Sequence, residues 1–257
     1  MDLGLKDRVA IVTGGSKGLG RAEAEALAAE GAGVVIATSK SVREADQVVR
    51  GLLDKGCRAI SVQADVTQRA DVERLVETAM KAFGRLDILV NNAGTIGPPL
   101  SRPLMDLTVD LWDFILANHL RSTFLCIKYS APHMVKQGWG RIINTSSIHG
   151  RMGGRPTLGH YGAAKAGVIA LTMTAARELG PNGITANVIA PGFIGTETLR
   201  GIFDAQRMEK LQQQIPLGRI GEPAEVGRVV AFLASEAASY VNGAVVDLTG
   251  GRLEYFF

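Results

Sequence analysis

The stretch VAIVTGGSKGLG, residues 9–20, decides the fold. Its first four residues, Val9–Val12, form an apolar strand-like run, and four glycines follow before a helical pattern begins. Glycines allow a sharp turn and let a phosphate approach bare backbone amides, and the N-terminus of the next helix attracts that phosphate. The spacing is Gly-x3-Gly-x-Gly, which differs from the commoner Gly-x-Gly-x-x-Gly. Alone, this turn is only a weak indication of dinucleotide binding.

Outward from this turn, short β-branched runs alternate with longer helical stretches. The alternation predicts βαβ units, and uninterrupted apolar runs indicate strands that are buried on both faces. We therefore expect an α/β fold, a Rossmann-type doubly wound parallel sheet, in a single domain over residues 1–257. The strand-like runs cover 9–12, 34–37, 59–62, 86–90, 141–144, 184–188 and 244–246, and the clearest helical stretches cover 22–29, 72–82 and 163–179.

One segment, at about residues 195–219, interrupts the alternation. Its pattern is helical and it ends near Pro216 and Gly218. An excursion between strands often covers a ligand crevice, so we expect this one to cover the substrate. An extra pair of surface helices explains the pattern equally well.

The composition is that of a soluble globular protein, with 46% hydrophobic and 21% charged residues. The net charge of +3 is too small and too evenly spread to indicate a nucleic-acid partner. No apolar run is long enough to span a membrane, and the first eight residues do not resemble a signal peptide. Cys57 and Cys126 form neither a CxxC pair nor a metal-ligand spacing. We expect a soluble cytoplasmic protein without a bound metal.

The glycine-rich turn also contains a second pattern. Gly14-x-Ser16-x-Gly18 matches the nucleophile elbow of serine hydrolases, in which Ser16 would attack an ester. An elbow on the first strand is unusual, and it gives Lys17 and Gly20 no role. A serine hydrolase is therefore a remote alternative. This alternative stays open because four histidines follow Ser16 in the sequence and any of them could be the base of a hydrolase. They are His119, His133, His149 and His160.

Tyr161 and Lys165 stand four residues apart at the start of a helical stretch. At this spacing the phenol and the ammonium lie on one face of the helix. A nearby cation favours the phenolate and lowers the phenol pKa, which is ordinarily about 10. Such pairs are common, but here Ser146 and Ser147 end the preceding strand, at the edge where ligands bind in these sheets. Together these side chains indicate acid–base chemistry on a substrate oxygen.

These segments together resemble the short-chain dehydrogenase/reductase family, and the resemblance covers almost the whole chain. It implies an enzyme that transfers hydride between a nicotinamide cofactor and a secondary alcohol or ketone. A non-catalytic dinucleotide sensor of this fold would be expected to lack Tyr161 or Lys165. The matching segments, in order, are 13–20, 65–66, 91–94, Ser147, Tyr161 with Lys165, 191–192, 239–243 and 250–251.

The resemblance implies a role for each matching residue. Tyr161 would be the acid/base, Lys165 would lower its pKa and bind the nicotinamide ribose, and Ser147 would orient the carbonyl. His149 and Phe193 would join Ser147 and Tyr161 in contacting the substrate. The positions implied to bind the dinucleotide are Gly14, Ser16, Lys17, Gly18, Leu19, Gly20, Thr38, Ser39, Lys40, Asp65, Val66, Asn91, Ala93, Gly94, Tyr161, Lys165, Pro191, Gly192, Ile194 and Thr196. Structural alternatives are a turn-forming asparagine for Asn91 and a helix N-cap for Thr196.

The chain departs from the family pattern at one catalytic position. The family places an asparagine five residues before Phe124, where this chain has His119, with Asn118 one step earlier. In the family, the backbone at this site holds a water of the proton relay. We therefore expect His119 to be positional. A second departure is one extra residue between Ser147 and Tyr161, which lengthens the loop at 150–159.

The end of the second strand bears on the choice of dinucleotide. NAD enzymes of this type place a carboxylate there to bind the ribose hydroxyls, but here Thr38 stands at that position. Lys17, Ser39 and Lys40 suit a 2′-phosphate, and no carboxylate repels it. We therefore favour NADP(H) and keep NAD as possible. The alternative for Lys40 is a solvated helix start.

The sequence does not name the substrate. Reductases of 3-oxoacyl groups on acyl carrier protein are relatives within the family, and basic residues beside their mouth dock the acidic carrier. Gly138 and Asn182 stand at the matching positions and are uncharged. We therefore favour a small free carbonyl or polyol, and we keep the 3-oxoacyl-(acyl-carrier-protein) reductase as an alternative.

The last six residues, Arg252–Phe257, extend beyond Gly250 and Gly251 and include three consecutive aromatic residues. Aromatic side chains left in water would form an exposed apolar patch, and a neighbouring subunit is the nearest cover. Family members commonly form tetramers. We expect a homotetramer with this tail in a subunit interface, although folding back onto its own domain is an alternative.

Overall fold

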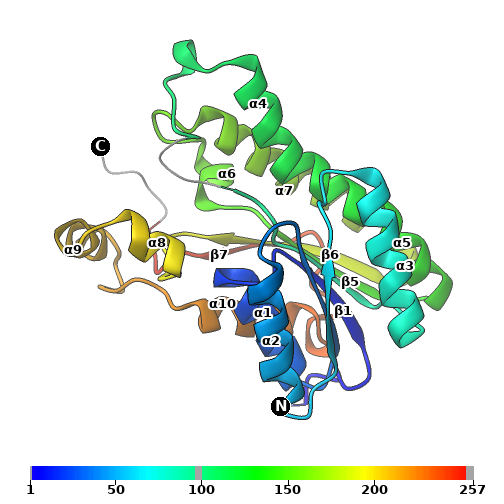
Figure 1. Cartoon of the computed structure of the whole chain (residues 1–257). Helices are drawn as coiled ribbons and strands as arrows, with labels where there is room; N and C mark the ends of the chain where they lie inside the picture. Colours follow the sequence, from blue (N-terminus) through cyan, green and yellow to red (C-terminus); the bar gives the residue numbers. More distant parts are fainter. Residues whose placement is uncertain (1, 96–99, 253–257) are drawn as a thin grey trace.

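A computed structural model describes residues 2–95 and 100–252. Seven strands form one parallel sheet in the order β3-β2-β1-β4-β5-β6-β7 (Figure 1). Each apolar run predicted from the sequence contributes one strand, so the predicted fold class is confirmed. The strands are β1 (Val9–Thr13), β2 (Gly33–Thr38), β3 (Ala59–Gln63), β4 (Ile88–Asn91), β5 (Gly140–Thr145), β6 (Ile184–Pro191) and β7 (Val245–Leu248).

Helices cover both faces of the sheet (Figure 1). On one face α1 (Gly18–Ala29) lies between α2 (Val42–Leu53) and α10 (Pro223–Leu233), and on the other α5 (Ser122–Gln137) lies between α3 (Arg69–Phe83) and α7 (Gly159–Leu179). The chain passes to one side of the sheet after β1 and to the other side after β4. This reversal creates the crevice in which doubly wound folds bind ligands. The shorter helices are α4 (Val109–Leu116), α6 (Ile148–Met152), α8 (Glu197–Ile202), α9 (Ala205–Gln213) and single turns at 104–106, 180–182 and 236–238.

The strands divide the core into two layers because successive side chains point to opposite faces. Ala10 and Val12 of β1 pack beneath α1, α2 and α10, whereas Ile11 packs beneath α3, α5 and α7. Both sets are fully buried. Burial on both faces explains the uninterrupted apolar runs. Because every strand pair is parallel, the carboxyl ends of all seven strands lie at one edge of the sheet.

The segment predicted as an excursion contains α8 and α9. Figure 1 shows both helices beside the sheet, on the side where the described chain ends. Thr196 and Asp204 cap the two helices with side-chain oxygens that accept hydrogen bonds from Leu199 N and Arg207 N. The helical pattern is therefore confirmed, and the covering of a substrate remains a prediction.

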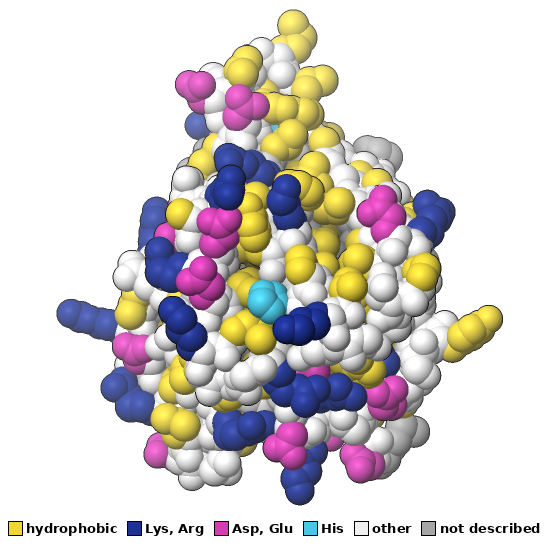
Figure 2. Space-filling model, turned by 90° about the vertical axis from the view of Figure 1, so that its right-hand side faces the viewer, with side chains coloured by type: hydrophobic (Ala, Val, Ile, Leu, Met, Phe, Trp, Pro, Cys, Tyr) yellow, Lys and Arg dark blue, Asp and Glu magenta, His cyan; other side chains and the backbone are white. Residues whose placement is uncertain are grey.

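Exposed apolar side chains gather around α4 and α5. Leu104, Met105 and Val109 lie at or before the start of α4, and Phe114 and Phe124 follow on α4 and α5. Figure 2 shows hydrophobic side chains concentrated in the upper part of the face that carries these helices. In the described ranges 2–95 and 100–252, no helix has both the length and the apolar character needed to cross a bilayer.

Candidate active site

The glycine-rich turn joins β1 to α1 at the carboxyl edge of the sheet. Gly14 and Gly18 have φ values of +68° and +57°, which side chains rarely permit. A side chain at Gly20 would collide with the Gly14 carbonyl and the Asn92 side-chain amide. The tightness of the turn therefore explains why glycines are spaced as they are.

The start of α1 presents its amides without a side-chain cap. Lys17 occupies the N-cap position and makes no capping hydrogen bond, and the first turn holds no acidic residue. Free amides and the helix dipole favour an anion at this point. The arrangement therefore fits the pyrophosphate of a dinucleotide.

The end of β2 lies beside the turn. The Ser16 hydroxyl lies 3.5 Å from the Thr38 hydroxyl, and Thr38 Oγ1 also accepts a hydrogen bond from Ser41 N. Ser39 and Lys40 follow and are exposed. This end of the strand thus carries hydroxyls and a cation, and its chemistry fits a phosphorylated ribose.

The other predicted cofactor positions border the same edge. Asn91 ends β4, and Ala93 N donates to Thr13 Oγ1. Leu19 packs partly buried against the core, Val66 is buried, and Asp65 accepts two hydrogen bonds from Thr67. Pro191 ends β6, and Gly192 N donates to Leu248 O. Ile194 is buried, and Thr196 caps α8 while lying opposite Gly18.

The serine, tyrosine and lysine predicted to be catalytic meet at the end of β5. Ser147 hydrogen-bonds Tyr161, and its Oγ accepts a hydrogen bond from His149 N at 3.2 Å. Lys165 Nζ donates to Thr145 O at 2.6 Å and lies 5.9 Å from the centre of the Tyr161 ring. Ser147, Tyr161 and Lys165 are all buried. The sequence spacing therefore brings a phenol, an ammonium and a hydroxyl into one cluster.

Ser146 and Ser147 have different partners. The Ser146 hydroxyl donates to Lys165 O at 2.8 Å and so joins β5 to α7. Gly150 of α6 packs directly against both Ser146 and Lys165, where a side chain would not fit. Only the Ser147 hydroxyl is directed at Tyr161, which agrees with the preference for Ser147 over Ser146.

The protonation state of Tyr161 differs from the sequence-based expectation. Burial raises the pKa of Tyr161 to about 12, and the hydrogen bond with Ser147 opposes this rise. The effect of burial exceeds the lowering expected from Lys165, whose ammonium is directed at the Thr145 carbonyl. The phenol is therefore protonated at neutral pH.

His119 lies in a π-helical segment, Ala117–Arg121, between α4 and α5. Its Nε2 donates to Thr95 O at 2.8 Å, and its ring meets that of Tyr161 edge to face, with centroids 5.1 Å apart. The imidazole also packs directly on Gly94, where a Cβ would clash. Burial, aided by the Lys165 charge, lowers the pKa of His119 to about 3. The imidazole is therefore neutral and supports its neighbours.

Of the predicted substrate residues, Ser147 and His149 contact Tyr161 directly. The His149 ring lies edge to face with the Tyr161 ring at 5.7 Å, and burial lowers the pKa of His149 to about 4. The fourth predicted substrate residue, Phe193, lies under Arg252, whose guanidinium stacks 5.0 Å from the centre of the ring. Arg252 also contributes to the lowered pKa of His149, so these three side chains share one region.

Comparisons with known proteins agree with this geometry. A family model described as enoyl-(acyl carrier protein) reductase matches residues 14–252. A 3-oxoacyl-(acyl-carrier-protein) reductase of Synechocystis sp. is 41% identical over 252 residues, 98% of this chain and 99% of that relative. The chain belongs to the short-chain dehydrogenase/reductase family.

Further relatives support the same assignment. A 3-oxoacyl-(acyl-carrier-protein) reductase of Staphylococcus epidermidis is 40% identical and covers 95% of this chain, which covers 98% of it. Among solved structures, a dehydrogenase/reductase from Sinorhizobium meliloti 1021 has a TM-score of 0.91 and 34% identity, with 98% of each chain covered. The protein is thus a short-chain oxidoreductase with a single Rossmann-type domain.

Membership of this family removes the hydrolase alternative. Ser16 is buried, and its hydroxyl lies beside Thr38. No histidine in the part of the chain that the model describes is hydrogen-bonded to Ser16. Ser16 therefore lacks the base that a nucleophile needs.

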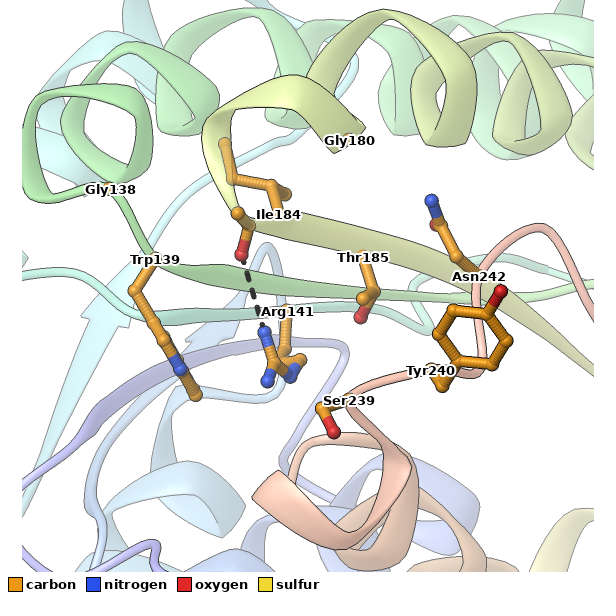
Figure 3. A pocket seen from close by; sticks show the side chains of 10 residues that line it. Gly138, Trp139, Arg141, Gly180, Ile184, Thr185, Ser239, Tyr240 and Asn242 are labelled. Carbon is orange, nitrogen blue, oxygen red and sulfur yellow. Dashed lines mark hydrogen bonds between the residues drawn. The ribbon is translucent and has the colours of Figure 1, made fainter.

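The two positions weighed for carrier-protein docking lie away from the catalytic cluster of this chain. Gly138 and Asn182 precede β5 and β6, at the amino edge of the sheet, and Gly183 packs on the Gly138 carbonyl. Figure 3 shows the hollow at this edge, which Trp139 and the buried Arg141 also line. The expectation that Gly138 and Asn182 lie beside the mouth of the active site is therefore wrong within one subunit. The length of the strands separates the amino edge, where these residues lie, from the carboxyl edge, where the catalytic cluster lies.

The sequence reasoning missed a buried polar chain under the site. Asn91 Nδ2 donates to Asn144 Oδ1, and Asn144 Nδ2 donates to Thr172 Oγ1, each at 2.8 Å. These bonds join β4 and β5 to α7 at Thr172, about two helical turns after Lys165. The sequence did contain an indication of these bonds. Asn144 is the one uncharged polar residue in the predicted strand 141–144, and a buried amide side chain needs hydrogen-bond partners. Thr13 was also missed, although its hydroxyl accepts hydrogen bonds from Asn92 N and Ala93 N.

Proposed function

We propose that this protein transfers hydride between NADP(H) and a secondary alcohol or ketone. The buried cluster of Ser147, Tyr161 and Lys165, beside the glycine-rich turn, carries this proposal. When bound, the nicotinamide supplies or accepts the hydride. The protein residues then have to bind the substrate oxygen and move one proton.

In the reductive direction Tyr161 donates its proton to the carbonyl oxygen. The raised pKa of Tyr161 keeps the phenol protonated, as an acid must be. The Ser147 hydroxyl hydrogen-bonds the same oxygen and orients it. The Lys165 ammonium, held by the Thr145 carbonyl, stabilises the phenolate that remains, because an opposite charge favours the ionised form.

The preference for NADP(H) rests on the end of β2. Thr38 and Ser39 offer hydroxyls, and Lys17 and Lys40 offer charge without a neighbouring carboxylate on that strand. A 2′-phosphate binds such a set, whereas a ribose 2′-hydroxyl gains little from the lysines. The remaining positions that would hold the dinucleotide are those that border the turn and the ends of β4 and β6.

For the substrate we favour a small free carbonyl or polyol. Gly138 and Asn182 lie away from the mouth of their own subunit and carry no positive charge, so they offer an acidic carrier protein no basic contact even where another subunit brings them to its mouth. We expect α8 and α9 to cover the substrate from the side of Phe193. A 3-oxoacyl thioester is the second candidate, since the relatives described above are reductases of 3-oxoacyl-(acyl-carrier-protein).

One assay separates these substrates. Purified protein is mixed with NADPH or NADH and with small ketones, 3-oxoacyl-(acyl-carrier-protein), or the same acyl group on N-acetylcysteamine, and the reduced cofactor's absorbance is followed. We expect turnover of free ketones with NADPH. A carrier-protein substrate turned over at least tenfold better than its N-acetylcysteamine analogue would instead establish the second candidate. No turnover with any substrate, in either direction, would contradict the proposed function.

We also propose a homotetramer in the cytoplasm. The exposed hydrophobic side chains on α4 and α5 provide a surface for a subunit contact. The free thiols Cys57 and Cys126 fit a reducing compartment. The tail predicted to reach an interface, residues 253–257, lies outside the described residues.

The oligomer is tested by light scattering on the full chain, a Phe114→Glu variant and a chain lacking residues 255–257. We expect a tetrameric mass for the full chain and smaller species for the charged variant, because burying a carboxylate in an apolar contact is costly. A lower mass or lower thermal stability after the deletion would support the tail's role. A monomeric full chain would contradict the tetramer.

A further inference from the structure

Two buried histidines that the hydride-transfer mechanism does not use hold the loop after β4. His119 Nε2 donates to Thr95 O at 2.8 Å, and His160 Nε2 donates to Leu100 O at 2.9 Å. A carbonyl oxygen can only accept, so each imidazole carries its proton on Nε2. The exposed fractions of His119 and His160 are only 4% and 1%. Both hydrogen bonds are therefore shielded from water, and they hold the backbone of this loop at two points.

Both histidines belong to the surroundings of Tyr161. His160 directly precedes Tyr161 in the first turn of α7. The His119 ring lies edge to face with the Tyr161 ring at 5.1 Å, and it also packs on Gly94, where a Cβ would clash. Gly94 opens the loop and is one of the positions implied to line the cofactor. The two histidines therefore determine where the loop lies relative to the catalytic phenol.

The loop after β4 is joined to the loop between α6 and α7. Arg102 N donates to Thr157 O at 3.0 Å, and Leu100 packs against the apolar cluster that contains Leu158 and Tyr161. Thr157 has a φ of +75°, in the left-handed region that a β-branched residue rarely adopts. Such strain persists only where the surrounding contacts hold it, and it is most frequent at functional sites. The two loops therefore form one unit beside the phenol.

We propose that His160 is a positioning residue that, together with His119, holds the two joined loops against α7 as one wall of the substrate site. The proposal rests on the proposed function, because the wall acts on a substrate that Tyr161 protonates. Tyr161 and Lys165 lie on α7 and Ser147 lies just after β5, so none of the three belongs to this wall. Loosening the wall should therefore weaken substrate binding more than it slows the chemical step.

The first test compares three variants by steady-state kinetics of ketone reduction. His160→Phe keeps a ring but removes the N–H that Leu100 O accepts, whereas His160→Gln keeps an N–H donor. We expect His160→Phe to raise KM for the ketone about tenfold and to change kcat by less than about threefold, because a buried carbonyl loses its donor. His160→Gln should restore KM toward the wild-type value. His133→Phe is the matched control, since His133 lies near the end of α5, toward the amino edge of the sheet.

Two kinetic results would overturn the proposal. An unchanged KM in His160→Phe would show that this hydrogen bond does not hold the substrate wall. A fall in kcat larger than the rise in KM would show that His160 acts through its neighbour Tyr161 and not through the loops. If His160→Phe does not fold, His160→Met, which also lacks an N–H donor, takes its place in both tests.

The second test, hydrogen–deuterium exchange of the full chain, needs neither cofactor nor turnover. We expect peptides that contain Leu100 or Thr157 to exchange about two- to tenfold faster in His160→Phe than in the wild type, and peptides from β7 to keep their rate. His160→Gln should exchange like the wild type. Unchanged exchange at both loops would overturn the proposal. If the wild type turns over no substrate, the proposed function fails, and the exchange still decides whether His160 holds the loops.

Discussion

The two halves of the carboxyl edge of the sheet differ in the chemical groups that they present and in how far these groups are buried. Around β1 and β2 the edge consists of backbone amides, glycines and exposed polar side chains, typified by Gly14 and Lys40. Around β5 and α7 it consists of buried polar side chains, typified by Tyr161 and Lys165. The first half suits a large anionic ligand that arrives with its own charge. The second half sets protonation states by excluding water, so small changes there should have larger effects.

The largest effect is expected for Tyr161→Phe. Removing the hydroxyl removes the proton donor, and such groups contribute about 10²–10⁴-fold to turnover. Cofactor affinity should change little, which a fluorescence titration with NADPH checks. Tyr240→Phe is the matched control, because Tyr240 is fully exposed at the opposite edge of the sheet. Retention of more than about a tenth of the rate would show that Tyr161 is not the acid.

A smaller effect is expected in the cofactor half. Lys17→Ala combined with Lys40→Ala removes two cations that we assign to the 2′-phosphate. Both lysines are exposed, where an ion pair contributes about 0.2–1 kcal/mol, so NADPH affinity should fall about two- to thirtyfold. NADH affinity should stay nearly unchanged. Lys81→Ala, on α3 and exposed, provides the control. An equal loss for both cofactors would show that these lysines do not recognise the phosphate.

The smallest effect is expected for His119→Asn. The lowered pKa of His119, about 3, keeps the imidazole neutral throughout the range from pH 5 to 8. A residue that does not titrate in this range cannot shape the pH profile there. Turnover should therefore stay within about tenfold of the wild type, with an unchanged profile between pH 5 and 8. A loss as large as that of Tyr161→Phe, in a folded variant, would place His119 in proton transfer.

The fold could be predicted from the sequence because a strand that is buried in a parallel sheet appears in the sequence as a short apolar run. All seven strands appear as apolar runs, and their boundaries differ by only a few residues; β4, for example, begins at Ile88 where the run begins at Leu86. The meeting of Ser147, Tyr161 and Lys165 was predictable for a related reason. Tyr161 and Lys165 are four residues apart and so lie on one face of a helix, and Ser147 follows the end of a strand at the same edge of the sheet.

Other properties of the site depend on contacts that no spacing reveals. The rise in the pKa of Tyr161 comes from burial. The Lys165 ammonium is held by its hydrogen bond to the Thr145 carbonyl, at 5.9 Å from the centre of the Tyr161 ring. Glu23 fits the helical pattern of α1 so well that nothing in the sequence marks it as buried. Burial of a single side chain depends on helices distant in sequence, here α10, whose position only the folded chain provides.

The last described residues, which follow β7, are hydrogen-bonded to the helical excursion at about residues 195–219. Leu217 N donates to Gly250 O at 3.1 Å, and Arg252 Nη2 donates to Gln214 Oε1 at 3.0 Å. Figure 1 shows the start of the chain at the bottom of the molecule, whereas α8 and α9 lie at its left. An affinity tag fused after Phe257 would follow these hydrogen-bonded residues by only five positions in the sequence. Protein for kinetic work should therefore carry its tag at the amino end.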